Sequence, residues 1–132
     1  MSLDNKILDI TFAADEDLTA DQFKIVVLDA TSGQVRRPNA ATDIPLGVLQ
    51  NAPNVGEAAV VRVIGCGGIS LVQASAALGI GTIVGMTYVS ATDGGKAQAA
   101  VTTQYPVGVL LSASANADEL CSMLMTPLTV KA

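Results

Sequence analysis

The middle of this chain is almost free of charged side chains. Between Ile44 and Thr92 the charged residues are Glu57 and Arg62, whereas acidic residues are concentrated in the segment before Ala30. Exposing a large apolar patch to water is unfavourable. An apolar stretch of this length must therefore be buried in protein, cross a membrane or be covered by a partner. The fold must therefore provide cover for most of these residues.

Composition excludes several classes of protein. The 132-residue chain carries 12 acidic and 7 basic residues, whereas nucleic-acid binders need an excess of cations. It has no histidine, which removes the Ser-His-Asp relay and most zinc and iron sites. Cys66 and Cys121 lack the CxxC spacing, so two buried thiols are expected. We therefore expect one folded domain that is not an enzyme and that needs no metal or cofactor.

A membrane segment is one interpretation of the charge-poor centre. Residues 69–89 are long enough to cross a bilayer, and Gly81 and Gly85 have the GxxxG spacing of closely packed membrane helices. However, no Lys/Arg cluster flanks either end, so the usual signal for membrane orientation is missing. Burial within the protein is the favoured interpretation, and a membrane-associated protein stays an alternative.

A nucleotide-binding turn is the second alternative. The apolar run Val60–Ile64 leads into the glycine-rich turn Gly65–Gly68, which resembles the phosphate-binding turn of Rossmann-type proteins. In such a module a helix would follow the turn. Ser70 stands where the third glycine of the motif would be, and the next strand does not end on an acidic residue. A small Rossmann-like module is therefore the weaker hypothesis.

Turn residues at short intervals favour an all-β fold. The 12 glycines and 5 prolines separate short β-branched runs, and no helical apolar spacing persists over three turns. We expect at most one or two short helical turns, at residues 19–22 and 75–78, and a tight turn at Asp93–Gly95. The architecture predicted is a small barrel-like or sandwich domain of short antiparallel strands. The predicted strands are Ile7–Phe12, Phe23–Leu28, Val35–Arg37, Leu46–Gln50, Ala58–Ile64, Ile69–Ala74, Thr82–Val89, Gln98–Thr102, Val107–Leu111 and Leu120–Met125.

One motif occurs twice. Pro45-Leu46-Gly47-Val48-Leu49 matches Pro106-Val107-Gly108-Val109-Leu110, and in each case a loop, an acidic residue and a further strand follow. The acidic residues are Glu57 in the first copy and Asp118 and Glu119 in the second. A proline suits a strand start, and a glycine within a strand indicates a bulge or a close backbone approach. The sequence therefore predicts a duplicated hairpin.

The first copy of this motif carries a resemblance to a known family. The run Pro45–Val63, followed by Gly65, is similar to the central signature of the head decoration (cement) proteins of tailed bacteriophages, and the segments Ala14–Leu28 and Asp93–Lys96 also fit. The resemblance implies a β-rich protein, made in the cytoplasm of the host bacterium, that binds the outer capsid surface of the virion. It implies the major coat protein and a homotrimer as partners, stabilisation of the coat lattice as the role, and no contact with nucleic acid or membrane.

Two regions follow from this interpretation. Residues 1–17 form an N-terminal arm or edge strand, and residues 18–132 form the β decoration domain. Apolar residues of the arm and of the charge-poor centre are the candidate contacts with other copies or with the coat protein: Leu8, Ile10, Phe12, Ile69, Leu71, Leu78 and Ile80.

Two polar groupings could bind a ligand, but each has a simpler explanation. Asp15-Glu16-Asp17 with Asp21 offers oxygen ligands for a cation, although it lacks a calcium-loop pattern, and a solvated acidic loop is favoured. Arg36 and Arg37 could bind an anion or a coat-protein carboxylate, but a solvated strand end is the favoured interpretation.

Overall fold

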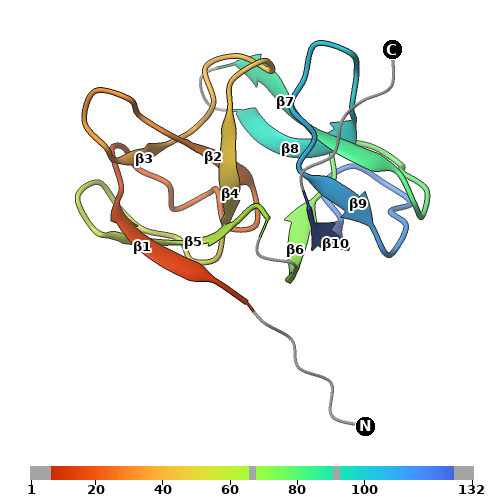
Figure 1. Cartoon of the computed structure of the whole chain (residues 1–132), viewed down its shortest axis with the longest axis horizontal. Coiled ribbons are helices and arrows are strands. Elements are labelled where there is room, and N and C mark those ends of the chain that lie inside the picture. The colour runs from red at the N-terminus through yellow and green to blue at the C-terminus, as the bar shows by residue number, and fades with distance from the viewer. Residues whose placement is uncertain (1–6, 66–67, 91–92, 127–132) are drawn as a thin grey trace, which may run out of the picture.

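The computed structural model describes residues 7–65, 68–90 and 93–126, and their strands form two five-stranded antiparallel sheets (Figure 1). The first sheet contains β1 (Asp9–Ala13), β2 (Ile25–Leu28), β3 (Val35–Arg36), β4 (Pro45–Leu49) and β5 (Ala58–Val63). The second contains β6 (Ile69–Gln73), β7 (Ile83–Ser90), β8 (Asp93–Ala99), β9 (Gly108–Leu110) and β10 (Leu120–Met125). The all-β prediction is confirmed.

The two sheets have the same topology. The strand order is β1-β5-β4-β2-β3 in the first sheet and β6-β10-β9-β7-β8 in the second, so each strand corresponds to the strand five places later. The pairing register also repeats. In the first sheet a cross-strand row runs Asp9–Arg62–Val48–Ile25, and in the second the corresponding row runs Ile69–Leu124–Val109–Ile83. We refer to residues 7–65 as the first half and residues 68–126 as the second half.

Hydrogen bonds outside the strands repeat in the same way. The amide of Ala14 donates to the carbonyl of Glu57 at 2.9 Å, and that of Ala74 donates to Glu119 at 2.8 Å. The same two alanines form isolated parallel bridges to β3 and β8, which bring the outer strands of each sheet together at one point. The predicted duplication is therefore confirmed, and it extends from a hairpin to a whole five-stranded sheet. Among the described residues neither sheet closes into a barrel, and the architecture is sandwich-like.

The two halves share a core. One cluster of buried side chains lies within the first half and includes Leu18, Leu49 and Val61. The other lies in the second half, but Ile25, Val27 and Val48 of the first half belong to it. The outer face of β2 and β4 thus covers the interior of the second half.

Backbone and side-chain contacts reinforce this junction. The amide of Gln73 donates to the carbonyl of Phe23 at 2.9 Å, and the Gln50 side-chain amide donates to the Ser70 hydroxyl at 2.9 Å. At Gly95 the backbones come so close that an added Cβ would overlap the carbonyl oxygen of Ile25. The junction therefore depends on a glycine as well as on apolar packing.

Two local predictions are wrong. The predicted turn Asp93–Gly95 forms the start of β8, where the pairing with β7 shifts register twice. Consequently the returning strand begins earlier than expected, and residues 100–102 of the predicted strand lie beyond its end at Ala99. A register shift lets the chain absorb two glycines within a strand, which a turn rule based on composition does not anticipate.

The segment after the glycine-rich turn differs from what the nucleotide-binding interpretation requires. The helix that a nucleotide-binding turn requires is replaced by the strand β6, two residues after Gly67. In the described parts of the chain, no helix is long and apolar enough to span a bilayer. The segments expected to form short helical turns, residues 19–22 and 75–78, contain no helix, and Leu78 forms an isolated antiparallel bridge to Ser114. Cys66 lies outside the described residues.

Candidate functional site

The described residues contain no pocket and no group of side chains suited to hold a metal ion. Cys121 is a free thiol on β10 and is fully buried.

The acidic segment and Arg37 bind each other. Arg37 Nε lies 2.8 Å from Asp21 Oδ2, Arg37 Nη1 lies 3.1 Å from Glu16 Oε1, and Nη2 donates to the carbonyl of Asp17. Lys24 Nζ lies 3.3 Å from the other oxygen of Asp21, whose side chain is buried. The Arg37 guanidinium thus links the chain before β2 to the end of β3. Arg37 is therefore not the solvated strand end that the sequence predicted.

Arg36 has carboxylate partners of its own. Its side chain lies 3.7 Å from Asp29 Oδ2 and 3.5 Å from Asp43 Oδ2. Asp29 also accepts hydrogen bonds from the amides of Thr31 and Ser32, which hold the pKa of its carboxyl below the usual range. Both arginines are thus engaged in the turns that flank β3.

The acidic residues of the repeated motif close equivalent loops. Glu57 accepts from the amide of Asn54 at 3.4 Å, and Glu119 accepts from the amide of Ala115 at 2.8 Å. The Ala115 hydrogen bond, followed by that of Asn116, lowers the pKa of Glu119. These carboxylates hold the loops that precede β5 and β10, as expected for polar strand starts.

A continuous apolar row crosses the outer face of the second sheet. Its four members come from neighbouring strands in the order β6, β10, β9 and β7, and each is paired with the next. Ile69 is 42% exposed and Ile83 is 38% exposed, and the two between them are half-buried. We call this row the second-half surface: Ile69, Leu124, Val109 and Ile83.

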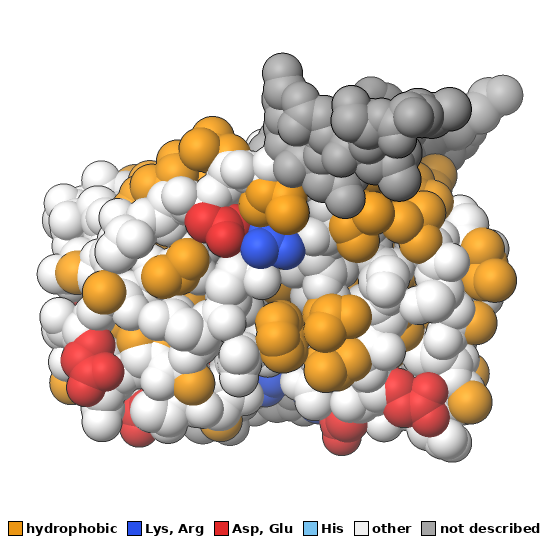
Figure 2. All heavy atoms as spheres, turned by 90° about the horizontal axis from the view of Figure 1, so that it is seen from below, with side chains coloured by type: hydrophobic (Ala, Val, Ile, Leu, Met, Phe, Trp, Pro, Cys, Tyr) orange, Lys and Arg blue, Asp and Glu red, His pale blue; other side chains and the backbone are white. Residues whose placement is uncertain are grey.

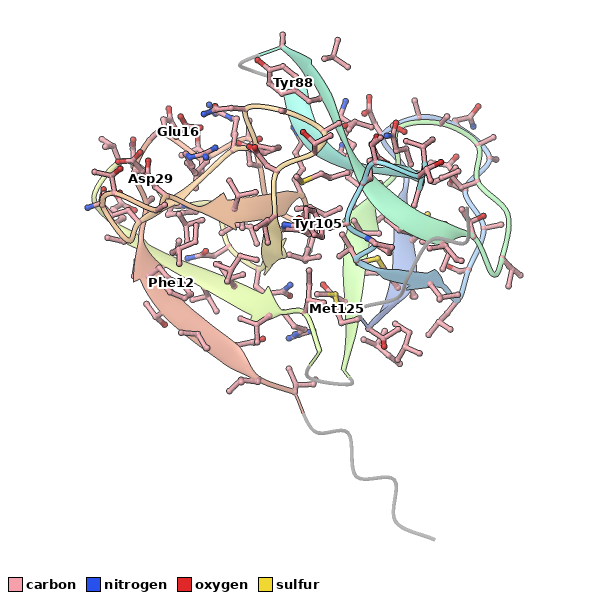
Figure 3. The ribbon with its side chains drawn as sticks, turned by 45° about the horizontal axis from the view of Figure 1, so that its top comes forward. Phe12, Glu16, Asp29, Tyr88, Tyr105 and Met125 are labelled. Atoms are coloured by element: carbon pink, nitrogen blue, oxygen red, sulfur yellow. The ribbon has the colours of Figure 1, made fainter. Side chains whose placement is uncertain are left out.

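A second group of partly exposed apolar residues lies on the first half. Ile10 is 39% exposed, Leu28 is 42% exposed, and the other three are half-buried against the first-half core. In Figure 3, Phe12 lies at the outer side of the first half, whereas Met125 lies near the junction of the two sheets. We call this group the first-half surface: Ile10, Phe12, Leu28, Leu46 and Val63.

Seen from below, the molecule carries several hydrophobic patches with few charged groups between them (Figure 2).

The predicted contact residues are distributed over different environments. Ile10 and Phe12 belong to the first-half surface and Ile69 belongs to the second-half surface, whereas Leu78 packs against the second-half core. Leu8, Leu71 and Ile80 are exposed. Their role as contacts stays a prediction.

The sequence pattern missed several residues of the two surfaces. Ile83, Val109 and Leu124 are brought together by strand pairing between segments far apart in the chain. The repeated motif carried a usable signal for Val109, because it occupies the position of Val48 in the other copy. Burial at one copy and exposure at the other could be known from the tertiary structure alone.

The fold defines a class of all-β protein in which one five-stranded sheet occurs twice in tandem. Within that class, the chain is similar to the solved structure described as the head fiber gp8.5 N base in bacteriophage phi29. The TM-score is 0.65, the sequence identity is 13%, and the match covers 96% of this chain and 99% of that chain. At this identity the likeness shows a common fold. No protein-family model matches the sequence, and no curated protein matches it.

Proposed function

We propose that this protein is a structural component of a tailed-phage head, where it binds the outer capsid surface and stabilises the coat lattice. The observation that carries the proposal is the shared fold with a head fiber base over nearly the full length of both chains. The resemblance of residues 45–63 to head decoration proteins supports the same role from the sequence.

The proposed partners are the major coat protein and further copies of this chain, as a homotrimer. Exposed apolar side chains such as Leu71, at 41%, and Ile80, at 74%, offer surface for the coat protein. Weak individual contacts suffice, because a trimer bound at several points gains affinity from its linked sites. The role assigned requires no catalysis, cofactor, nucleic acid or membrane. Synthesis in the bacterial cytoplasm would precede attachment to the virion.

Co-sedimentation tests the proposal. Heads assembled from the coat protein encoded in the same genome should bind the purified protein saturably, and the bound heads should withstand a higher temperature than bare heads. Ile80→Asp should weaken this binding, since it places a charge in the proposed contact. The matched control is Val55→Asp, which changes an exposed valine in the loop before β5. Absence of the protein from sedimented heads would overturn the proposal.

A further inference from the structure

We infer that the protein associates with itself head to tail, with the second-half surface of one copy covering the first-half surface of the next. The contact that the first half makes with the second half within one chain is the basis for this association, which does not require attachment to a phage head.

The face of β2 and β4 that packs onto the second half has a counterpart on β7 and β9, but the residues of the two faces differ in exposure. In the first half, Ile25 and Val48 are fully buried because they pack into the second-half core. The equivalent residues of the second half are Ile83, which is 38% exposed, and Val109, which is half-buried. The second half therefore presents to the outside the face that the first half uses as an internal interface.

The residues that pack against Ile25 and Val48 in the second half are buried, whereas their counterparts in the first half are partly exposed. In the second half, Val72, Met86, Val107 and Met125 are at most 1% exposed, in the cluster that Ile25 and Val48 complete. Strand correspondence gives their counterparts in the first half as Phe12, Leu28, Leu46 and Val63. These four are half-buried or exposed. The first half therefore presents an uncovered version of the site that receives Ile25 and Val48.

Two glycines at equivalent positions in the two halves also differ in whether another backbone approaches them. Gly95 lies two residues before Ala97, has φ +88°, and approaches the backbone of Ile25. Gly33 lies two residues before Val35, has φ +70°, and has no atom within 4 Å of an added Cβ. In a head-to-tail contact the backbone at Ile83 of a neighbouring copy would approach Gly33, as that of Ile25 approaches Gly95.

Residues at equivalent positions of the two halves differ in a way that favours a hydrophobic contact at the second-half surface. Arg62 and Asp9, which form an ion pair at 2.9 Å in the first half, correspond to Leu124 and Ile69 in the second. Replacing an ion pair by two aliphatic side chains on an outward face makes exposure to water costly and burial favourable. The internal junction shows that the equivalent face, on β2 and β4, packs against the equivalent site in the second half. A second copy of the chain is thus the occupant to which this surface is best matched.

A contact between two different surfaces is heterologous, and it generates a closed ring when its rotation divides a full turn. In the homotrimer proposed above, three copies would place first and second halves alternately around one axis. Each surface of every copy would then be covered.

Light scattering of the purified full chain tests the inference. Wild type should have at least twice the mass of a single chain at micromolar concentration. Leu124→Arg introduces the residue found at the equivalent position 62, and Leu28→Glu places a charge in the receiving site. Each variant alone should be monomeric, whereas their equimolar mixture should form dimers, because one intact pair of surfaces remains. Val55→Glu, on an exposed loop, should retain the wild-type mass.

The two variants separate this contact from a symmetric one that pairs either surface with itself. Such a contact would leave the variant altered in the other surface fully assembled. Circular dichroism and a cooperative thermal transition establish that each variant is folded, and Ile83→Lys replaces Leu124→Arg if the latter does not fold. A monomeric wild type, full assembly by either surface variant, or a mixture that stays monomeric would overturn the inference.

Discussion

Gly47 on β4 faces the backbone of β5 so closely that a Cβ at this position would overlap the carbonyl oxygen of Arg62. The second half repeats this relationship, because a Cβ at Gly108 would overlap the carbonyl oxygen of Leu124. Both glycines belong to the repeated Pro-x-Gly-Val-Leu motif. The motif therefore requires glycine at this position, because two strands approach each other too closely for a Cβ.

Substitution of either glycine by alanine should therefore destabilise the fold. Gly47→Ala and Gly108→Ala force two paired strands apart, and we expect each to lower the free energy of unfolding by about 3 kcal/mol. Urea denaturation measures this quantity. Gly79→Ala is the matched control, because an added Cβ there meets no atom within 4 Å and the backbone φ is ordinary. Equal effects of the three substitutions would contradict the explanation.

Removal of the Asp21 carboxylate should have a large effect on stability. Asp21 is 1% exposed and lies between the charged groups of Arg37 and Lys24. Asp21→Ala leaves both cations without this partner in a low-dielectric site, and we expect a loss of about 3 kcal/mol in chemical denaturation. Asp15→Ala, on the exposed part of the same segment, should change stability by less than about 0.5 kcal/mol. A small effect of Asp21→Ala would show that the network is dispensable.

Stability should fall in acid. Hydrogen bonds lower the pKa of Glu119 in the folded state, so its contribution is present above the ordinary pKa of 4.5 and is lost as the pH falls through the lowered value. The hydrogen bond from Lys96 lowers the pKa of Asp118 in the same way. The melting temperature should therefore decrease as the pH falls below 4.5, and Glu119→Gln should make this decrease shallower. A melting temperature independent of pH in this range would contradict the assignment.

Cys121 should resist alkylation in the native protein. The side chain is fully buried in the second-half core, and the reactive thiolate needs access to solvent. Treatment with iodoacetamide followed by peptide mass spectrometry should leave Cys121 unmodified before denaturation and label it fully afterwards. A Cys66→Ser background removes any exchange between the two thiols. Rapid native labelling of Cys121 would contradict its placement in the core.

The strand pattern was accessible from the sequence because it depends on local properties. Short β-branched runs between turn residues located β10 at its observed bounds, and they located β2 and β5 to within two residues. The repeated motif also revealed the duplication, since equivalent strands need the same glycine at the same close approach. The failure at Asp93–Gly95 has a local cause as well, because a register shift can keep glycines inside a strand.

The distribution of exposure between the two halves was decided by the tertiary structure. Val48 and Val109 occupy equivalent positions in two copies of one motif, and nothing in their immediate sequence distinguishes them. Val48 is buried because the first half packs onto the second, whereas Val109 lies on the face that this packing leaves outside. The sequence determined that a charge-poor β protein with a repeated unit would form. Burial depends on contacts between residues far apart in the chain, so the tertiary structure alone decided which apolar residues became core and which remained as surface.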